Sequence, residues 1–264
     1  RLVYAHTGIN LGENKSQLVR VRLGKRLRAN GFRSFREYYR HVESDPTGEE
    51  LSRLIDAITT NTTHLFREPR HFELLRDIVT RWVTDRTWRA RHTSLRIWSA
   101  ASSTGEEPYS IGMVVDDVLS RHAPGIELRI LATDLSTQVL SRARQGVYES
   151  HRVGTVPPDL RMKYFRRIRE EGKTALQIIP ELRSRITFAR FNLMTPEFPF
   201  RHGFDIIFCR NVMIYFDRAT QETLVNKLAA QLHPGGYLMI GHSESLNGIR
   251  HPLEYVEPTV YRRV

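Results

Sequence analysis

Four polar segments each follow a short apolar run, and together they have the residue types to bind a nucleoside. The run at 95–99 leads into the small-residue segment SAASSTGEEP (99–108), which allows a backbone to turn tightly beside a ligand. Asp134 ends the second run, where a carboxylate can accept hydrogen bonds from a ribose diol. Asn192 and Leu193 could recognise the edge and face of an adenine, and CRNVMIY (209–215) follows the fourth run. Four such segments together indicate a nucleoside-binding site more strongly than any one of them does.

Two of these segments also carry helix-start signals. Thr104 followed by Glu107 is a capping-box pattern, and Pro108 suits a first helical turn. Asp134 could equally be the N-cap of a helix that begins near Ser136. A structural role therefore stays open for both segments.

Signatures of metal and nucleophilic chemistry are missing from the sequence. The eleven His residues are scattered, without an H-E-x-x-H pattern or a Cys at ligand spacing. The chain also lacks a G-x-S-x-G elbow and a G-x-x-x-x-G-K-[ST] phosphate loop. Cys209 lies in the apolar context FDIIFCRN and is interpreted as a core thiol. We therefore expect no metal, and S-adenosylmethionine is a nucleoside cofactor that needs neither metal nor phosphate recognition.

The polar segments can meet only if the apolar runs form one sheet. After residue 93, runs at 95–99, 127–133, 186–192, 204–209 and 236–241 alternate with helix-length segments. This alternation predicts β-α-β units and a parallel sheet with helices on both faces, which binds ligands at the carboxyl ends of its strands. Two further runs, at 253–256 and 260–264, predict a strand pair that closes one sheet edge, and the segment 163–185 predicts an inserted β-hairpin.

The N-terminal part reads as helical and carries most of the excess positive charge. Of the formal net charge of +11, residues 1–40 contribute +8, with ten Lys or Arg against two Glu. Val19, Leu23 and Leu27 recur every four residues and predict an inward apolar stripe. The cations that flank this stripe are Lys15, Arg22, Lys25 and Arg26. They are expected to face an acidic partner, whose class the composition does not identify.

Several long segments make the chain resemble the CheR-type chemotaxis protein methyltransferases, which use S-adenosylmethionine to methylate glutamates on chemoreceptors. The segments that carry the resemblance are TTNTTHLFREPRHF (59–72), RIWSAASSTGEEPYSIGM (96–113), ILATDLSTQVLSRARQGVY (130–148), FDIIFCRNVMIYFD (204–217) and LHPGGYLMIGHSESL (232–246). The resemblance implies a small helical domain at 1–75. A doubly wound, Rossmann-like α/β methyltransferase domain follows at 76–264, with a small β-subdomain inserted at about 160–185.

The resemblance also implies roles for individual residues. Arg67 and Tyr215 are expected to act in catalysis by orienting the reactants. The cofactor is expected to contact Asn61, Thr63, Arg67, Gly105, Glu106, Asp134, Asn192, Leu193, Arg210 and Asn211. The basic helix is expected to meet the acidic methylation region of a receptor's cytoplasmic helical bundle. The hairpin loop at 167–173 is charged and Gly-poor, which argues against tethering to a receptor's C-terminal pentapeptide.

Two other functions are compatible with parts of the sequence. A nucleic-acid methyltransferase would explain the basic N-terminus, but no [Asp/Asn]-Pro-Pro-Tyr-like motif follows the fourth strand; we expect no nucleic-acid partner. A non-catalytic adaptor of the receptor array would be expected to lose several cofactor contacts. With one cysteine, no signal-peptide pattern and no apolar run of about 18 residues, the chain is expected in the cytoplasm, without inserting into the membrane. The resemblance implies that it acts there at membrane-associated receptor arrays.

Overall fold

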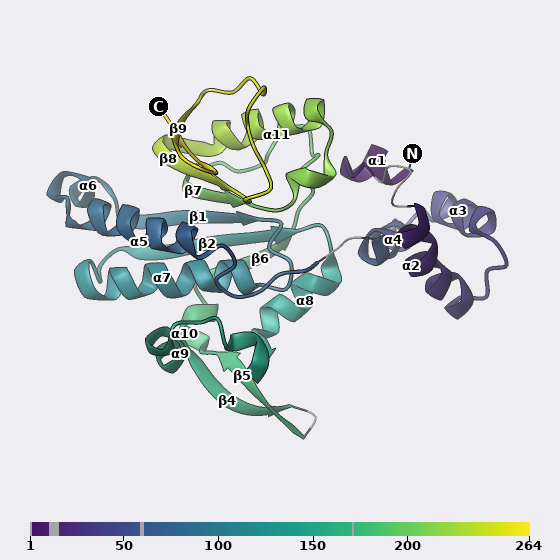
Figure 1. Ribbon diagram of the computed structural model, residues 1–264, viewed down its shortest axis with the longest axis horizontal. Coiled ribbons are helices and arrows are strands. Elements are labelled where there is room, and N and C mark those ends of the chain that lie inside the picture. The colour runs from purple at the N-terminus through teal and green to yellow at the C-terminus, as the bar shows by residue number, and fades with distance from the viewer. Residues whose placement is uncertain (1, 11–15, 59–60, 171) are drawn as a thin grey trace.

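The larger part of the molecule is built on a seven-stranded sheet (Figure 1). The computed structural model describes residues 2–10, 16–58, 61–170 and 172–264. The sheet has the order β6-β2-β1-β7-β8-β10-β9. Its strands are β1 (Ser94–Ala100), β2 (Glu127–Asp134), β6 (Ile186–Arg190), β7 (Phe204–Cys209), β8 (Leu232–Ile240), β9 (Leu253–Glu257) and β10 (Val260–Arg263). The first five are parallel, and β10 pairs antiparallel with β8 and β9, which confirms the predicted sheet and its closing strand pair.

Successive residues of the central strands point into two different cores, one on each face of the sheet. Ile97 packs with the residues of α5 and α7, whereas its neighbour Trp98 packs with the residues of α11. All six residues of β7 are buried, as in a strand covered on both faces. The covering helices are α5 (Pro69–Thr84), α6 (Arg86–Arg91), α7 (Glu106–His122), α8 (Thr137–Gln145) and α11 (Arg218–Gln231). The structure therefore has the doubly wound arrangement that the sequence predicts, and Cys209 is a core thiol.

A second, three-stranded sheet is inserted between α8 and β6 and lies below the main sheet in Figure 1. The predicted hairpin is present as β4 (Phe165–Glu170) and β5 (Lys173–Ile178). β5 also pairs with β3 (Val147–Glu149), which lies before the predicted range of about 160–185. The remaining elements of this subdomain are η2 (Ser150–Val153), α9 (Pro158–Tyr164) and α10 (Pro180–Arg183).

The described residues of the N-terminal part form the helices α1 (Leu2–Thr7), α2 (Ser16–Ala29), α3 (Phe35–Ser44) and α4 (Glu49–Ile58). They enclose a small core of their own, which includes Leu23, Leu27, Tyr38 and Leu54. Leu23 and Leu27 are buried as the predicted stripe requires, while the side chain of Val19 lies outside the described residues. None of the described helices in the whole chain is long and apolar enough to span a bilayer.

The cationic face of α2 differs from the one that the sequence predicts. Arg26 points inward, with its guanidinium 2.6 Å from a Glu50 carboxylate oxygen and its Nε 3.0 Å from the Tyr38 hydroxyl. Arg22 is half-buried and donates to the carbonyl of Ile58 at 2.9 Å. Arg26 turns inward because the carboxylate of Glu50 is itself buried and needs a counter-charge. Lys25 is exposed as predicted, and Lys15 lies outside the described residues.

The predicted domain boundary at residue 75 falls inside α5. Leu75 is fully buried, and it packs in the core that α7 and the central sheet share. Because a helix that contributes to one core belongs with that core, we propose that the two domains divide between α4 and α5.

Candidate functional site

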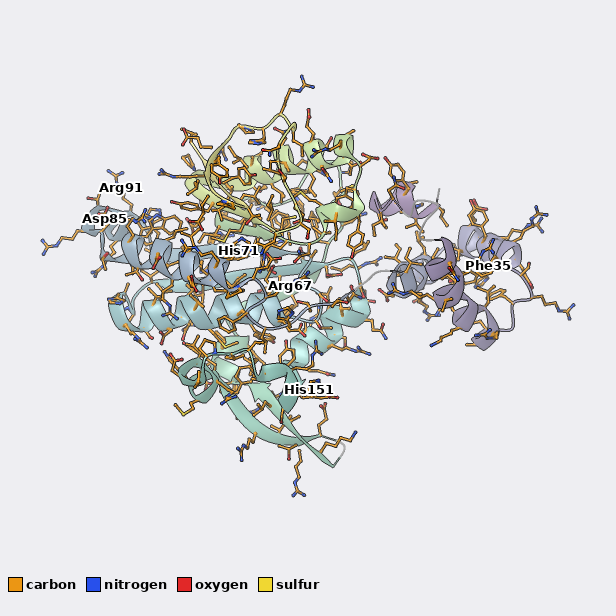
Figure 2. All side chains as sticks on the ribbon, viewed as in Figure 1. Phe35, Arg67, His71, Asp85, Arg91 and His151 are labelled. Atoms are coloured by element: carbon orange, nitrogen blue, oxygen red, sulfur yellow. The ribbon has the colours of Figure 1, made fainter. Side chains whose placement is uncertain are left out.

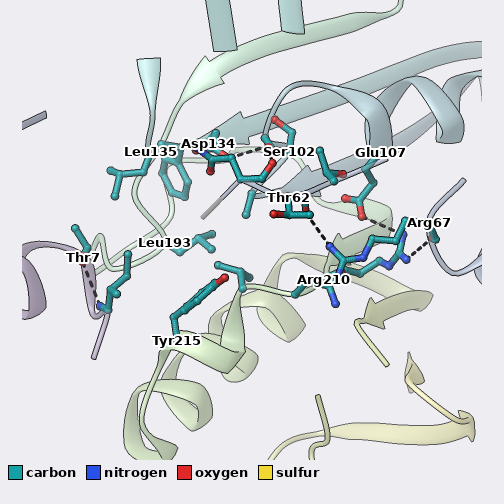
Figure 3. Close-up of a pocket in the computed structure, with 18 of the residues that line it drawn as sticks. Thr7, Thr62, Arg67, Ser102, Glu107, Asp134, Leu135, Leu193, Arg210 and Tyr215 are labelled. Atoms are coloured by element: carbon teal, nitrogen blue, oxygen red, sulfur yellow. Dashed lines mark hydrogen bonds and ion pairs between the residues drawn. The ribbon is translucent and has the colours of Figure 1, made fainter. Parts of the chain in front are cut away.

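A pocket lies where the carboxyl ends of β1, β2, β6 and β7 meet the segment that connects α4 to α5 (Figure 3). Most of the expected site residues line it: Asn61, Thr63, Arg67, Asp134, Asn192, Leu193, Arg210, Asn211 and Tyr215. The helical domain contributes Thr7, Ile9 and Ile58. The structure thus brings residues from two domains and four strand ends to one cavity.

The loop after β1 turns sharply at the edge of this pocket. Ala101 and Ser103 both line the pocket with positive φ angles of 71° and 48°, and Gly105 follows at 93°. Non-glycine residues in this region are strained, and such strain gathers at functional sites. Gly105 is the N-cap of α7 and makes no side-chain cap bond. The capping-box prediction is therefore wrong, because Thr104 instead donates to Glu106 and the Glu107 carboxylate accepts from Ser99.

Glu106 and Glu107 are neighbours in sequence but face different surroundings. Glu107 lines the pocket, whereas neither Glu106 nor Gly105 is among its lining residues. Glu106 is 1% exposed and forms an ion pair with Arg152 from η2. Burial raises the pKa of Glu106, although its bond from Thr104 and the Arg152 charge act in the opposite direction. Of the two glutamates, the structure thus places Glu107, and not the expected Glu106, at the pocket.

Asp134 holds the loops around the second strand end. One carboxylate oxygen accepts the Ser103 N–H at 2.9 Å, and the other accepts the Ser136 N–H at 2.9 Å. The N-cap of α8 is Ser136, whose hydroxyl accepts the Val139 N–H, so Asp134 is not the helix cap. Burial raises the pKa of Asp134 against the effect of these backbone donors. A carboxylate offers about four acceptor positions, so Asp134 keeps capacity for a ligand hydroxyl pair.

The third strand end forms an apolar wall with one amide. Leu135, Phe191 and Leu193 line the pocket here, and Leu193 is buried. The amide of Asn192 donates to the carbonyl of His6 in α1 at 2.6 Å, and its oxygen accepts the Met194 N–H at 3.0 Å. Asn192 therefore ties the helical domain to the pocket as well as lining it.

Arg210 lines the pocket and is buried between two carboxylates. Its side chain is 1% exposed and lies 2.8 Å from Glu68 and 3.2 Å from Glu107. Burial opposes ionisation of Glu68, but the Arg210 charge and the hydrogen bonds from Arg210, Asn211 and the His242 N–H together outweigh it and lower the Glu68 pKa. Burial raises the pKa of Glu107, which the same arginine only partly offsets. The charge of Arg210 is thus balanced by the protein itself.

Glu244 shapes the fourth strand end, a role that the sequence analysis does not assign. Its carboxylate accepts the backbone N–H groups of Asn211, Met213 and Gly241 at 2.6–2.9 Å. Asn211 has a positive φ of 59°, and a Cβ on Gly241 would lie only 2.4 Å from its side-chain nitrogen. The strained turn at Asn211 is therefore fixed by a buried acceptor and by a glycine that leaves it room.

Arg67 and Tyr215 face the pocket from opposite sides (Figure 3). Arg67 is half-buried in the segment before α5, and its guanidinium donates to the Thr62 carbonyl at 3.0 Å. It forms no ion pair with any carboxylate in the described part of the chain. Tyr215 ends the short helix η3 (Met213–Tyr215), and its carbonyl accepts the Asn10 N–H at 2.8 Å. Arg67 thus brings a charge to the pocket that the described carboxylates do not balance.

The pocket has the chemistry of a site for a nucleoside that carries an amino acid. It joins an apolar wall to the carboxylates of Asp134 and Glu107 and to the cations of Arg67 and Arg210. The Ser102 hydroxyl, in the pocket-lining loop after β1, is buried and finds no hydrogen-bond partner among the described residues. Because buried polar atoms are nearly always paired, this hydroxyl indicates a polar ligand group beside it. These residues fit S-adenosylmethionine.

Comparison with known proteins covers both parts of the chain. Residues 61–262 match the family model described as CheR methyltransferase, SAM binding domain, and residues 1–59 match CheR methyltransferase, all-alpha domain. A chemotaxis protein methyltransferase of Borreliella burgdorferi is 39% identical over 263 residues, which are 100% of this chain and 92% of that protein. Chemotaxis protein methyltransferase 2 of Pseudomonas aeruginosa is 41% identical over 98% of this chain and 89% of its own length. The chemotaxis protein methyltransferase of Escherichia coli is 38% identical over 99% of this chain and 87% of its own.

Proposed function

The chain belongs to the CheR methyltransferase family, and on that premise we propose that it methylates glutamate side chains of chemoreceptors. Its activity as an S-adenosylmethionine-dependent chemotaxis methyltransferase follows from the family. What we propose beyond the family assignment is the acceptor group, a glutamate carboxylate in the acidic methylation region of a receptor's cytoplasmic helical bundle. The products are a glutamate methyl ester and S-adenosylhomocysteine. The protein then acts at receptor arrays, in sensory adaptation.

The observation that carries this proposal is the contrast between the two arginines that line the pocket. Arg210 is paired with Glu68 and Glu107, so it offers little attraction to a further anion. Arg67 has only the Thr62 carbonyl as a recorded partner in the described part of the chain. An anionic acceptor group is thus favoured at Arg67, and a glutamate carboxylate is such a group.

A carboxylate acceptor also suits the groups that surround it. A glutamate with an ordinary pKa of about 4.3 is ionised at neutral pH, so the reaction requires no general base. Bound S-adenosylmethionine supplies an electrophilic methyl group on a sulfonium. Arg67 and Tyr215 hold the acceptor oxygen in line for attack, which is a positioning effect. A half-buried arginine suits this task, because tighter pairing would stabilise the reactant as much as the transition state.

The remaining pocket residues are proposed to hold the cofactor. Asp134 accepts the ribose hydroxyls, and Leu193 packs on the adenine beside Asn192. Ser102 and Glu107 bind the polar amino-acid portion, while Gly105 and Glu106 shape the loop that carries them. The segment before α5 adds contacts from Asn61, Thr63 and Arg67, and the fourth strand end adds Arg210 and Asn211.

The acceptor is tested by the chemical stability of the transferred methyl group. The full chain is incubated with methyl-labelled S-adenosylmethionine and a panel of receptor cytoplasmic fragments. A glutamate methyl ester releases its label as volatile methanol in mild base, whereas methylated nitrogen or nucleic acid does not. We expect base-labile label on the fragments and none on fragments whose acidic-region glutamates are replaced by alanine. Base-stable label, or transfer to RNA or DNA in its place, would contradict the proposal.

A further inference from the structure

A compact cluster of metal-ligand side chains lies behind the pocket wall. Glu68 is the N-cap residue of α5, His71 lies in the first turn of that helix, and His242 follows β8. One ligand atom from each residue lies within 4.8 Å of the other two. The nearest atoms are His71 Nδ1 and Glu68 Oε2 at 3.5 Å, and His242 Nε2 and Glu68 Oε2 at 3.9 Å. None of the three residues lines the pocket, so the cluster is a separate feature.

The buried member of the cluster has a nitrogen that lacks a partner. His71 is 1% exposed, and its Nδ1 has no hydrogen-bond partner among the described residues. Its Nε2 lies 2.7 Å from the Thr259 hydroxyl, which donates its own hydrogen to the Pro258 carbonyl. We therefore assign the ring proton to Nε2. That assignment leaves the Nδ1 lone pair directed at the Glu68 carboxylate, an unfavourable contact that a cation between them would relieve.

We propose that Glu68, His71 and His242 form a binding site for a divalent transition-metal ion, with Zn²⁺ as the ion that suits the donors best. Two imidazoles and one carboxylate are a known ligand set for zinc with an open fourth position. In a tetrahedral site with bonds of about 2.05 Å, ligand atoms lie about 3.3 Å apart. The 3.5 Å pair is already close to that spacing. His242 is 55% exposed, so its ring has room to close the longer distance.

The surroundings of the cluster support a metal in two ways. A metal-bound histidine usually donates its other ring N–H to a fixed acceptor, and the Thr259 hydroxyl accepts from His71 in this manner. Glu68 and Glu107 share one arginine, so these three groups carry a formal excess of negative charge. Arg210 bonds Glu68 Oε2 through Nη2 at 2.8 Å and through Nε at 3.3 Å. A metal would replace the longer of these bonds.

No metal is expected from the sequence, because the three ligands do not form a known metal-binding spacing. Glu68 and His71 are three residues apart, but His242 lies far along the chain, and only the fold brings it to them. The cluster also contains no cysteine. The proposed metal site can therefore be recognised only in the folded structure.

The test measures Zn²⁺ binding to the full chain, free of tags and stripped of metal with a chelator. Competition with a chromophoric chelator is expected to give one ion per chain with a micromolar or lower Kd. His242→Gln is the decisive variant, because His242 is exposed at the surface and its replacement is compatible with folding. We expect it to weaken Zn²⁺ binding at least tenfold. His151→Gln is the matched control: His151 also lies beside a glutamate, Glu149, but far from the cluster (Figure 2), and its affinity should equal that of the parent.

A second variant and a spectroscopic measurement complete the test. His71→Gln, checked for folding by circular dichroism, is expected to lose binding as His242→Gln does. Co²⁺ in place of Zn²⁺ should give the intense visible absorption of a four-coordinate ion in the parent and not in His242→Gln. Failure of the parent to compete for Zn²⁺ would overturn the proposal. Equal affinity in the parent and in His242→Gln would also overturn it, since scattered histidines would then carry the binding.

Discussion

The two walls of the pocket are built differently. The wall formed by the strand ends carries buried carboxylates, strained turns at Ala101, Ser103 and Asn211, and an arginine neutralised within the protein. The wall formed by the segment before α5 presents Arg67, which is half-buried and unpaired with any described carboxylate. Strain and buried charge are tolerated where surrounding structure fixes them. This difference supports our proposal that the first wall mainly holds the cofactor and that Arg67 on the second wall orients the acceptor.

The largest expected effect comes from removing the arginine of the strand-end wall. Arg210→Met leaves Glu68 and Glu107 buried without a counter-charge, which should lower the free energy of unfolding by about 3–5 kcal/mol. Arg67→Met is the matched control and should cost at most about 1 kcal/mol, because Arg67 takes part in no buried ion pair with a described carboxylate. Urea unfolding of both variants measures the difference. Similar stability for the two would mean that the walls do not differ as described.

Turnover, in contrast to stability, is expected to depend strongly on the residues that orient the acceptor. Arg67→Ala and Tyr215→Phe should lower kcat about a hundredfold, because both residues orient the acceptor, and a small misplacement costs that much. Their melting temperatures should stay near that of the parent, since neither change removes a buried ion pair. If either variant simply unfolds, its role is structural and the proposed division of labour fails for that residue.

Asp134 tests the cofactor side of the comparison. Asp134→Ala should weaken binding of S-adenosylhomocysteine by about 1.5–3 kcal/mol, the scale of a hydrogen bond to a charged group. Isothermal titration calorimetry gives this value directly. Asp134→Asn keeps an acceptor oxygen and should lose less. Unchanged affinity in Asp134→Ala would remove Asp134 from the cofactor site.

In the helical domain, the paired carboxylate of Glu50 should make the free energy of unfolding depend on pH. Burial opposes ionisation of Glu50, but hydrogen bonds from Arg26 and Tyr38 outweigh it and lower its pKa. Because the folded pKa lies below the unfolded value, this stabilisation is complete above about pH 4.3 and is lost as pH falls through the folded pKa. Glu50→Gln should therefore be less stable than the parent at neutral pH and show a flatter loss of stability in acid. Parallel pH profiles of the two proteins would contradict this role for the pair.

The smallest effect is expected at the exposed face of α2. The inward position of Arg26 makes it unsuitable for a charge-reversal test, so Lys25 and Arg28 take its place. Lys25→Glu with Arg28→Glu should raise KM for receptor fragments and weaken its salt dependence, with each charge contributing about 0–1 kcal/mol. Cofactor affinity should not change. Tight binding of the parent to duplex DNA in a gel shift, with methylation kinetics indifferent to the reversal, would assign this face to nucleic acid instead.

Much of the fold could be predicted from the sequence because local patterns determine it. Ile97 and Trp98 belong to an apolar run whose alternate residues supply the two cores, and such runs separated by helix-length segments indicate a parallel sheet. The three residues of β3 are too few to form a pattern, and they become a strand only by pairing with β5. The domain division that we propose differs from the predicted one because the sequence of α5 has a helical pattern whichever core the helix joins.

The site was predictable where one residue at one strand end suffices, as for Asp134. The site was harder to predict where contacts join distant segments, since Arg210 bonds to Glu68, 142 positions away in the sequence, and to Glu107, 103 positions away. Glu106 and Glu107 illustrate a different limit of prediction from the sequence. Neighbours on a helix point about 100° apart, and the sequence alone does not tell which of two adjacent glutamates faces the pocket. The inward turn of Arg26 was hidden in the same way, because it depends on Glu50 from another helix.

The central claim is that one wall holds the cofactor and the other orients the carboxylate. Single-turnover methylation of a receptor fragment, measured for Asp134→Ala and Arg67→Ala as S-adenosylmethionine is raised to saturation, tests it most directly. We expect Asp134→Ala to approach the parent rate at saturation, while Arg67→Ala stays about a hundredfold slower. Rescue of Arg67→Ala by added cofactor, together with an Asp134→Ala rate that stays low at saturation, would contradict it.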